Sequence, residues 1–335
     1  LPTGARMHRG HLSGPSTRQC FADLSFTTIL GPMPPAYPTG AALPPRAYVV
    51  GGGSDNVTVI DTSSHQVIGQ VVVGDEPMLP ALSPDGRLLL VTNRDSMNAT
   101  VIDTASLTVV HTVDVQDGAS GCAFSTDGTL AYVANEYSHT VSFIDTATWQ
   151  PLRHVPVGHG PCDLRVTPNG KHVIVTNEES HNIAVLEATT GQVQHIIPTP
   201  DGPLGLTIDP TGSFFLAACF IANHLVAVET RSWQVAWKVP VGSCHVGLCL
   251  AHQGRVALIT NADQDHLSVF DLKRRKEVSR IRVRANPAMV QVIPGSDLAY
   301  VTDRGADSVS VVDVRACKTI HTIPVGSSPL GVCIG

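Results

Sequence analysis

The sequence predicts an all-β protein that folds as a seven-bladed β-propeller with four antiparallel strands in each blade. Two observations predict this fold class. Charged residues make up only 15% of the 335 residues and hydrophobic residues 43%, a composition that favours strands over surface helices. A segment that ends in an acidic residue also recurs seven times at a fixed interval of 42 residues. That interval is typical of one propeller blade.

The seven copies align on their last acidic residue. In chain order they read AYVVGGGSDNVTVID, LLLVTNRDSMNATVID, LAYVANEYSHTVSFID, HVIVTNEESHNIAVLE, FFLAACFIANHLVAVE, VALITNADQDHLSVFD and LAYVTDRGADSVSVVD. Their last residues are Asp61, Asp103, Asp145, Glu187, Glu229, Asp271 and Asp313. Because the spacing never changes, the repeat indicates the architecture far more strongly than a single copy would.

Four strands are expected in each unit, and the fourth unit serves as the example. An apolar strand follows a proline in residues 161–166, and the turn at residues 168–170, PNG, leads to a second strand. A polar turn, EESH, precedes a third strand that ends at Glu187. A Thr-rich turn then leads to a fourth strand, so that each unit supplies one complete blade.

The two ends of the repeat indicate how the ring closes. The first unit begins at about Ala47 without a proline-led strand, whereas the C-terminus has one at residues 328–333. This segment, SPLGVC, matches GPLGLT at residues 202–207. The C-terminal strand is therefore expected to complete the first blade, so that the propeller spans residues 46–335. Residues 1–45 are expected to form an irregular, Pro/Gly-rich extension.

The repeat resembles a known family. LVTN, YVAN, IVTN, LITN and YVTD are each followed by a strand of the type V-x-V-[IF]-D. These motifs resemble those of the YVTN family of β-propellers, which includes surface-layer-like and periplasmic proteins, over about residues 46–335. The resemblance implies a periplasmic or secreted location, whereas a chain from which no signal peptide was removed would be cytoplasmic. Related propellers include lactonases and a muconate-type cyclase, so the resemblance does not determine the function.

The charge and the cysteines exclude several classes of function. A net charge of -6 gives no overall attraction to nucleic acid, and the apolar run at residues 214–222 is too short to span a bilayer. None of the eight cysteines forms a CxxC motif with zinc-site spacing. A local basic stripe, Lys273–Arg284, is the exception to the acidic balance. It is interpreted as a solvated sheet edge, with an acidic partner or nucleic acid as the alternative.

The loops predict which end of the ring carries the function. Hairpins such as PDG at residues 84–86 recur at one end, which we expect to be structural. The turns between second and third strands, and the crossovers between blades, emerge at the other end and differ from blade to blade. We expect a small molecule or a protein partner to bind on this variable face. Its histidines are His139, His159, His181, His224, His245 and His266.

The candidate site lies at the mouth of the central channel around blades three to five. The residues expected to act in catalysis, if the protein is an enzyme, are His159, Glu178, His181 and Arg165. The residues expected to contact a ligand are Glu136, Tyr137, His139, Asp163, Phe220, Ile221, His224, His245 and His266. This mixture of a few polar groups with apolar walls is typical of small-molecule pockets.

Strand alternation places Asp163 and Arg165 on the channel wall, with Leu164 packed between blades. Two interpretations of this charged pair are open. It is either an internal salt bridge between blades or an anion-binding arginine beneath a ligand pocket.

Three functions are compatible with the sequence. The first is a propeller that binds a small molecule or a protein partner. The second is an enzyme of the lactonase, lyase or cyclase type, in which Arg165 holds a carboxylate- or lactone-containing substrate while a histidine or glutamate moves a proton. The third is a metal-dependent enzyme in which a divalent metal, the candidate cofactor, is held by His139, His181 and Glu178. No GxSxG or HExxH motif is present to choose among them.

Overall fold

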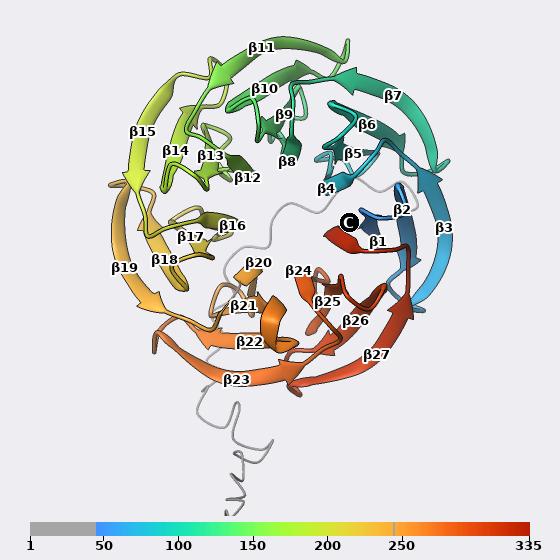
Figure 1. Cartoon of the computed structure of the whole chain (residues 1–335), viewed down its shortest axis with the longest axis vertical. Coiled ribbons are helices and arrows are strands. Elements are labelled where there is room, and N and C mark those ends of the chain that lie inside the picture. The colour runs from blue at the N-terminus through green and yellow to red at the C-terminus, as the bar shows by residue number, and fades with distance from the viewer. Residues whose placement is uncertain (1–44, 244) are drawn as a thin grey trace, which may run out of the picture.

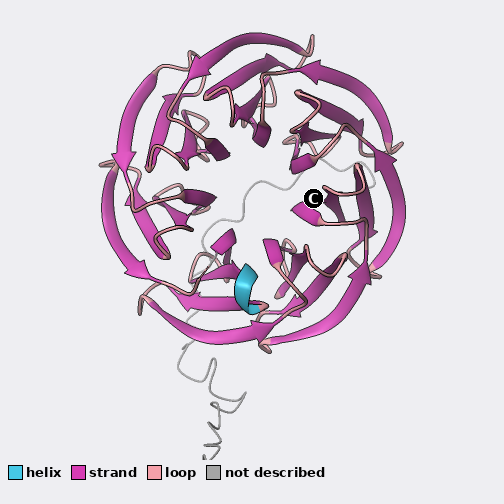
Figure 2. Ribbon diagram, in the orientation of Figure 1, coloured by secondary structure: helices cyan, strands magenta, loops and turns pink. Residues whose placement is uncertain are grey.

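The computed structural model describes residues 45–335, apart from residue 244 and the side chain of residue 245. Seven four-stranded antiparallel sheets stand around a central axis like the blades of a ring (Figure 1). Strands form almost all of the regular structure, and a 3-10 helix, η1 (Ala262–Gln264), lies between two of them (Figure 2). No helix in the described residues has the length and apolar character that crossing a bilayer requires. The predicted all-β, seven-bladed fold is confirmed. Residues 1–44 of the predicted extension lie outside the described residues.

The first four blades contain sixteen strands. Blade one consists of β28 (Pro329–Ile334), β1 (Arg46–Gly51), β2 (Asn56–Asp61) and β3 (Gln66–Val72). Blade two consists of β4 (Pro77–Leu82), β5 (Leu88–Asn93), β6 (Asn98–Asp103) and β7 (Thr108–Asp114). Blade three consists of β8 (Ala119–Phe124), β9 (Leu130–Asn135), β10 (Thr140–Asp145) and β11 (Gln150–Pro156). Blade four consists of β12 (Pro161–Val166), β13 (His172–Asn177), β14 (Asn182–Glu187) and β15 (Val193–Pro198).

The remaining three blades repeat the same order from the inner to the outer strand. Blade five consists of β16 (Pro203–Ile208), β17 (Phe214–Cys219), β18 (His224–Glu229) and β19 (Gln234–Pro240). Blade six consists of β20 (His245–Ala251), β21 (Val256–Asn261), β22 (His266–Asp271) and β23 (Lys276–Arg282). Blade seven consists of β24 (Pro287–Val292), β25 (Leu298–Asp303), β26 (Ser308–Asp313) and β27 (Lys318–Pro324).

The hydrophobic core is divided among the interfaces between neighbouring blades. Between blades three and four, Tyr132 and Phe143 pack edge-to-face, with ring centroids 5.0 Å apart, in one cluster with Leu164 and Val175. All four side chains are fully buried. Because each blade buries one face against the next, no blade can be stable without its neighbours.

The threonine of the repeated T-N pair joins neighbouring blades. Thr176 on β13 donates to the carbonyl of Leu204 in blade five at 3.0 Å, and Thr260 donates to Ala288 in blade seven at 2.7 Å. Thr302 makes the corresponding bond across the closure of the ring, to Leu330, at 2.7 Å. The motif that identified the repeat therefore fixes the inner strands relative to one another.

The C-terminal strand closes the ring, as the sequence predicted. β28 pairs antiparallel with β1, with Tyr48 opposite Cys333 and Val49 opposite Val332. The backbone of Arg46 exchanges hydrogen bonds with that of Gly335, at 2.8 and 3.1 Å. The first and last strands of the propeller are therefore neighbours in one sheet.

The basic stripe Lys273–Arg284 follows the outermost strand of blade six, β23. Arg280 is exposed and pairs with Glu277 at 2.8 Å. Arg275 lies over the ring of Trp237 in blade five, 5.6 Å from its centroid. The stripe lies on the circumference of the ring.

Asp303 occupies the position that asparagine holds in other blades. Asn93 is an example: its Nδ2 donates to Oδ1 of Asn98 at 2.7 Å, and its Oδ1 accepts from the amide of Gly74 at 3.2 Å. Asp303 makes equivalent contacts, accepting from Oγ of Ser310 at 2.8 Å and from a crossover amide at 3.2 Å. Its side chain is fully buried, and burial raises its pKa to about 6 although these hydrogen bonds oppose the shift.

We expect Asp303→Asn to raise the free energy of unfolding at pH 8 by about 1–2 kcal/mol. The folded-state pKa lies above the usual value of 3.8, so the protonated carboxyl stabilises the fold at low pH and this contribution is lost as the pH rises through 6. An amide keeps the hydrogen bonds without titrating. Chemical denaturation at pH 4 and pH 8 measures the effect. A similar gain at both pH values, or a loss at pH 8, would contradict the explanation.

Candidate functional site

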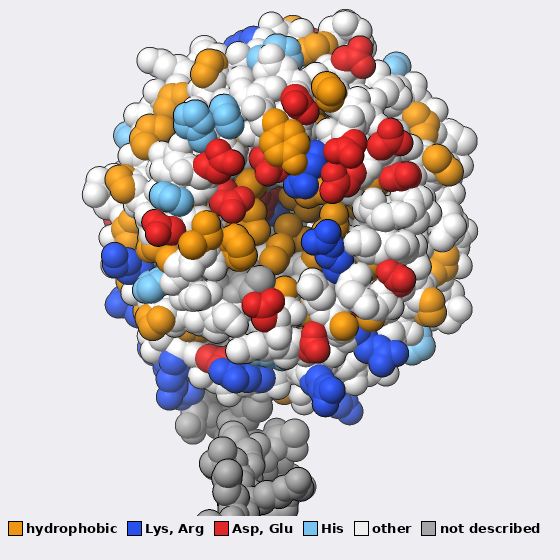
Figure 3. Space-filling model, viewed as in Figure 1, with side chains coloured by type: hydrophobic (Ala, Val, Ile, Leu, Met, Phe, Trp, Pro, Cys, Tyr) orange, Lys and Arg blue, Asp and Glu red, His pale blue; other side chains and the backbone are white. Residues whose placement is uncertain are grey.

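Two sets of loops meet at one end of the ring and form the variable face. In blades one to five and in blade seven, the turn between the second and third strands is hydrogen-bonded to the crossover that leads into the same blade. The bonds in blades two, three and four run from Arg94 N to Glu76 O (3.0 Å), from Glu136 N to Gly118 O (2.8 Å) and from Glu178 N to Gly160 O (2.8 Å). Asp and Glu side chains gather around a central hollow whose wall carries hydrophobic side chains (Figure 3).

A group of four charged side chains and one thiol lies at the channel mouth in blades two to four. We call Glu76, Arg94, Glu136, Cys162 and Glu178 the mouth cluster. Arg94 pairs with Glu136 at 3.0 Å and with Glu76 at 3.6 Å, and Sγ of Cys162 donates to Glu178 at 3.5 Å. The side chains of Arg94 and Glu136 are each only 20% exposed. The cluster thus presents several carboxylates around one guanidinium in a partly dry environment.

Burial and mutual repulsion control the protonation of the mouth cluster. Burial is the largest cause of a raised pKa at Glu136, the charge of Arg94 opposes it, and the carboxylate of Glu178 adds to it. Burial likewise raises the pKa of Glu76 against the effect of Arg94. Burial raises the pKa of the Cys162 thiol far above its usual range, so this thiol is a hydrogen-bond donor and not a nucleophile.

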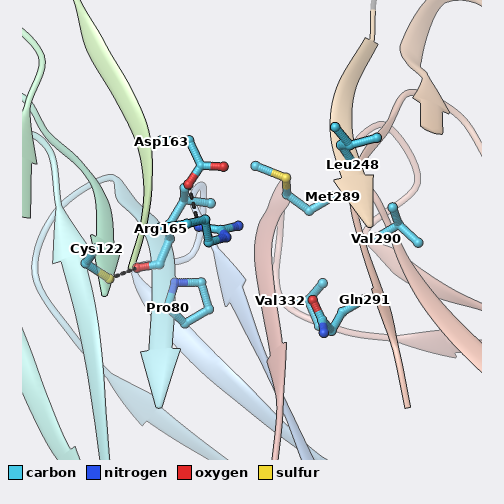
Figure 4. A pocket seen from close by; sticks show the side chains of 10 residues that line it. Pro80, Cys122, Asp163, Arg165, Leu248, Met289, Val290, Gln291 and Val332 are labelled. Carbon is cyan, nitrogen blue, oxygen red and sulfur yellow. Dashed lines mark hydrogen bonds and ion pairs between the residues drawn. The ribbon is translucent and has the colours of Figure 1, made fainter. Parts of the chain in front are cut away.

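Asp163 and Arg165 line the channel below this mouth (Figure 4). Nη1 of Arg165 lies 2.5 Å from Oδ1 of Asp163 and also donates to the carbonyl of Leu164 at 2.8 Å. Oδ2 of Asp163 accepts from the amide of Leu206 in blade five at 3.1 Å. The ion pair therefore forms within strand β12, and the bond between blades comes from the carboxylate and a backbone amide.

Asp163 and Arg165 stand in a channel wall whose other lining residues are mostly apolar. Burial is the largest cause of a raised pKa at Asp163, although Arg165 and two backbone amides favour its ionised form. Met289 and Gln291 from blade seven line the same cavity (Figure 4), and Leu79 from blade two also lines it. The side chain of Arg165 is 38% exposed, so part of its guanidinium stays hydrated although the pair lines the channel.

The structure separates the histidines that the sequence grouped. The rings of His139 and His159 lie together, with centroids 4.3 Å apart, and their nitrogens are within 4.8 Å of a carboxylate oxygen of Glu179. His181 instead lies 3.9 Å from Asp201. The expected metal-ligand set was His139, His181 and Glu178, whereas the structure brings His139 together with His159 and Glu179.

The other predicted ligand contacts are spread over the variable face. His224 lies 2.6 Å from the carbonyl of Ala222, and His266 is buried beside Glu277, with burial lowering its pKa. Phe220 is half-buried, and Ile221 is 52% exposed. The side chain of His245 lies outside the described residues.

Sequence reasoning missed Arg94, Glu76 and Glu179 as candidate site residues. The sequence could have identified Arg94, because Arg94, Glu136 and Glu178 occupy the same position in three successive repeats. Opposite charges at equivalent positions of neighbouring blades predict an ion pair across the channel mouth. The ring of Tyr137, which was predicted, is 52% exposed and lies 6.0 Å from the guanidinium carbon of Arg94.

Comparison with known families finds one match that spans most of the chain. Residues 46–329 match the model of the cytochrome D1 heme domain family. No curated protein matches the chain.

Several solved structures share the fold. A functionally unknown protein from Desulfotomaculum acetoxidans DSM 771 superposes with a TM-score of 0.77 at 13% identity, over 86% of this chain and 98% of that one. The periplasmic gluconolactonase PpgL of Pseudomonas aeruginosa gives 0.74 at 20% identity, over 87% and 99%. The dihydro-heme d1 dehydrogenase NirN in complex with DHE gives 0.65 at 20% identity, over 87% and 66%. These structures show that the chain shares the propeller fold of proteins with different activities.

The charge at the channel mouth does not suit a heme. A heme carries acidic side groups, which bind best beside unpaired cations. Arg94 is already paired with Glu76 and Glu136, and Glu178 adds a further carboxylate beside them. The mouth cluster would therefore repel the acidic groups of a heme.

Proposed function

Since the chain belongs to the cytochrome D1 heme domain family, whose fold serves different chemistries, we propose that it binds a small, neutral, polyhydroxylated molecule at the mouth cluster. The ligand that we expect is of the sugar-lactone type. The observation that carries the proposal is the convergence of Glu76 and Glu136 on Arg94, next to Glu178. Charged hydrogen-bonding groups that converge in a partly buried setting are the usual mark of a ligand site.

The charge balance of the cluster selects the class of ligand. Within the mouth cluster, three carboxylates stand against one guanidinium, and Arg304 adds a second positive charge that acts on Glu76. The remaining excess of negative charge disfavours anions, and the carboxylates accept hydrogen bonds from hydroxyl groups. Arg94 holds two of these carboxylates in place and can donate to a carbonyl oxygen. The exposed ring of Tyr137 supplies an apolar surface for the carbon face of the ligand. A neutral lactone with several hydroxyls suits these groups better than a free carboxylate.

We expect D-gluconolactam, a neutral and hydrolytically stable mimic of a sugar lactone, to bind the protein, and Glu136→Gln to weaken this binding. The substitution removes the charged acceptor and its pairing with Arg94. Hydrogen bonds to charged groups contribute about 1.5–3 kcal/mol, so the affinity should fall about tenfold or more. Isothermal titration calorimetry of both proteins measures the difference.

Glu229→Gln is the matched control, because Glu229 is exposed at the end of β18 and accepts from Ser232 at 2.8 Å. This variant should bind the lactam like the parent. D-gluconate, the anionic counterpart, should bind at least tenfold more weakly than the lactam. Equal affinity of the parent and Glu136→Gln for the lactam, with equal melting temperatures, would contradict the proposal.

Lactone hydrolysis is the second candidate function. It is favoured by the likeness to a periplasmic gluconolactonase, of which the alignment covers 99%. A carboxylate of the mouth cluster would accept a proton from the attacking water. Release of acid from glucono-1,5-lactone, followed in a pH-stat and corrected for the spontaneous reaction, separates an enzyme from a binding protein. If the parent protein does not accelerate the release of acid, ligand binding without hydrolysis remains as the proposed function.

A further inference from the structure

Two imidazoles and a carboxylate from neighbouring blades come together beside the mouth cluster. His139 lies in the turn between β9 and β10, His159 in the crossover between β11 and β12, and Glu179 in the turn between β13 and β14. One nitrogen of each ring and one carboxylate oxygen all lie within 4.8 Å of one another. We propose that His139, His159 and Glu179 bind a divalent transition-metal ion, with Zn²⁺ as the representative.

The backbone holds the three residues in position. The amide of His159 donates to Oγ of Ser180 at 2.7 Å, and the amide of Ser180 donates to the carbonyl of His159 at 3.3 Å. The carbonyl of His139 accepts from Val157 at 3.0 Å. Gly160, with φ +66°, lets the crossover approach the next turn so closely that a Cβ there would lie 3.0 Å from Cγ of Glu179. The ligands are therefore held on two turns and a crossover that hydrogen bonds fix in position.

The contacts of His139 leave one of its nitrogens available to a metal. Nδ1 lies 3.0 Å from the carbonyl of Glu136 and 3.3 Å from the amide of Gly160. If Nδ1 carries the proton, it donates to the carbonyl, and Nε2 has a free lone pair. Metal-binding histidines commonly donate their other N–H to a backbone carbonyl in this way. Binding of an ion would select this tautomer over the one that accepts from Gly160.

The donor set determines the class of ion. Two imidazole nitrogens and one carboxylate suit zinc and the neighbouring first-row metals, whereas Mg²⁺ and Ca²⁺ prefer all-oxygen sites. Three protein ligands leave at least one coordination position for water or a ligand. Nearby Glu136 and Glu178 add negative potential that attracts a cation. The site goes beyond the proposed ligand-binding function, because metal binding can be measured without the lactam.

The test is titration of chelator-treated, full-length protein with ZnCl₂ by isothermal titration calorimetry. The parent should bind one Zn²⁺ per chain, and His159→Ala and Glu179→Gln should each lower the affinity. Loss of a metal-coordinating side chain should lower the metal affinity at least as much as loss of a group that hydrogen-bonds to such a side chain, which is about tenfold to a hundredfold. Binding of Co²⁺ should also produce a visible absorption band that both variants lose. Unchanged zinc affinity in both variants would overturn the proposal.

His181→Ala is the matched control, because His181 occupies the same repeat position as His139 but lies beside Asp201. It should bind zinc like the parent. If His181→Ala loses zinc while His159→Ala keeps it, the ion lies elsewhere on the face and the proposed site is wrong. Displacement of zinc by an equal concentration of MgCl₂ would also overturn it, because it would indicate a general acidic surface. Melting temperatures without metal confirm that each variant is folded.

Discussion

Deleting residues 328–335 is expected to abolish the cooperative unfolding transition of the propeller. The deletion removes β28, which pairs with β1 and lies between blades seven and two. It leaves the inner edge of blade one unpaired and opens the cluster in which Ala47 and Val49 pack with Tyr300. The loss should approach the whole net stability of a domain, about 5–15 kcal/mol.

Thermal unfolding followed by circular dichroism, together with size-exclusion chromatography, measures this effect. The shortened chain should aggregate or melt without a sharp transition, because an open ring exposes strand edges. A chain that lacks only Gly335 is the control, because it loses the backbone bonds to Arg46 but keeps the strand. A deletion variant that melts at the temperature of the parent would mean that the ring does not depend on its C-terminal closure.

Replacing Asp163 by alanine is expected to lower the free energy of unfolding by about 3–5 kcal/mol. Asp163 is only 3% exposed, its side chain accepts from the amides of Leu164 and Leu206, and it pairs with Arg165. The substitution leaves two buried amides without acceptors and a cation without its partner. Urea denaturation of the purified variant measures the loss.

Arg165→Gln is the comparison that separates the two partners. Arg165 is 38% exposed and can stay hydrated, and the buried carboxyl that it leaves behind can take up a proton. We therefore expect a smaller loss, about 1–2 kcal/mol. If Arg165→Gln destabilises the protein more than Asp163→Ala, or if Asp163→Ala unfolds like the parent, the pair does not stabilise the inner wall in the way inferred here.

The fold could be predicted from the sequence because a propeller is a local repeat. Each 42-residue unit contains its own strands and turns, and the unmatched strand at residues 328–333 indicated the ring closure. Alternation along the inner strand also placed Asp163 and Arg165 on the channel wall. These inferences depend only on residues in the same blade or in an adjacent blade, and the repeat determines the relative positions of these residues.

The site could be predicted only in part, because it depends on where loop side chains end. Sequence reasoning selected the variable face and His139, but equivalent repeat positions suggested His181 as its partner. His139 meets the crossover residue His159, whereas His181 lies beside Asp201. The three-way contact of Glu76, Arg94 and Glu136 likewise depends on rotamers and burial, which no spacing in the sequence encodes.

A crystal structure of the protein with D-gluconolactam tests most directly whether the mouth cluster is the ligand site. We expect electron density for the lactam at the channel mouth in blades two to four, with its hydroxyls within hydrogen-bond distance of Glu136 and Arg94. Density at the opposite end of the ring, or in the channel against Arg165 while the mouth cluster stays free of ligand, would contradict this expectation.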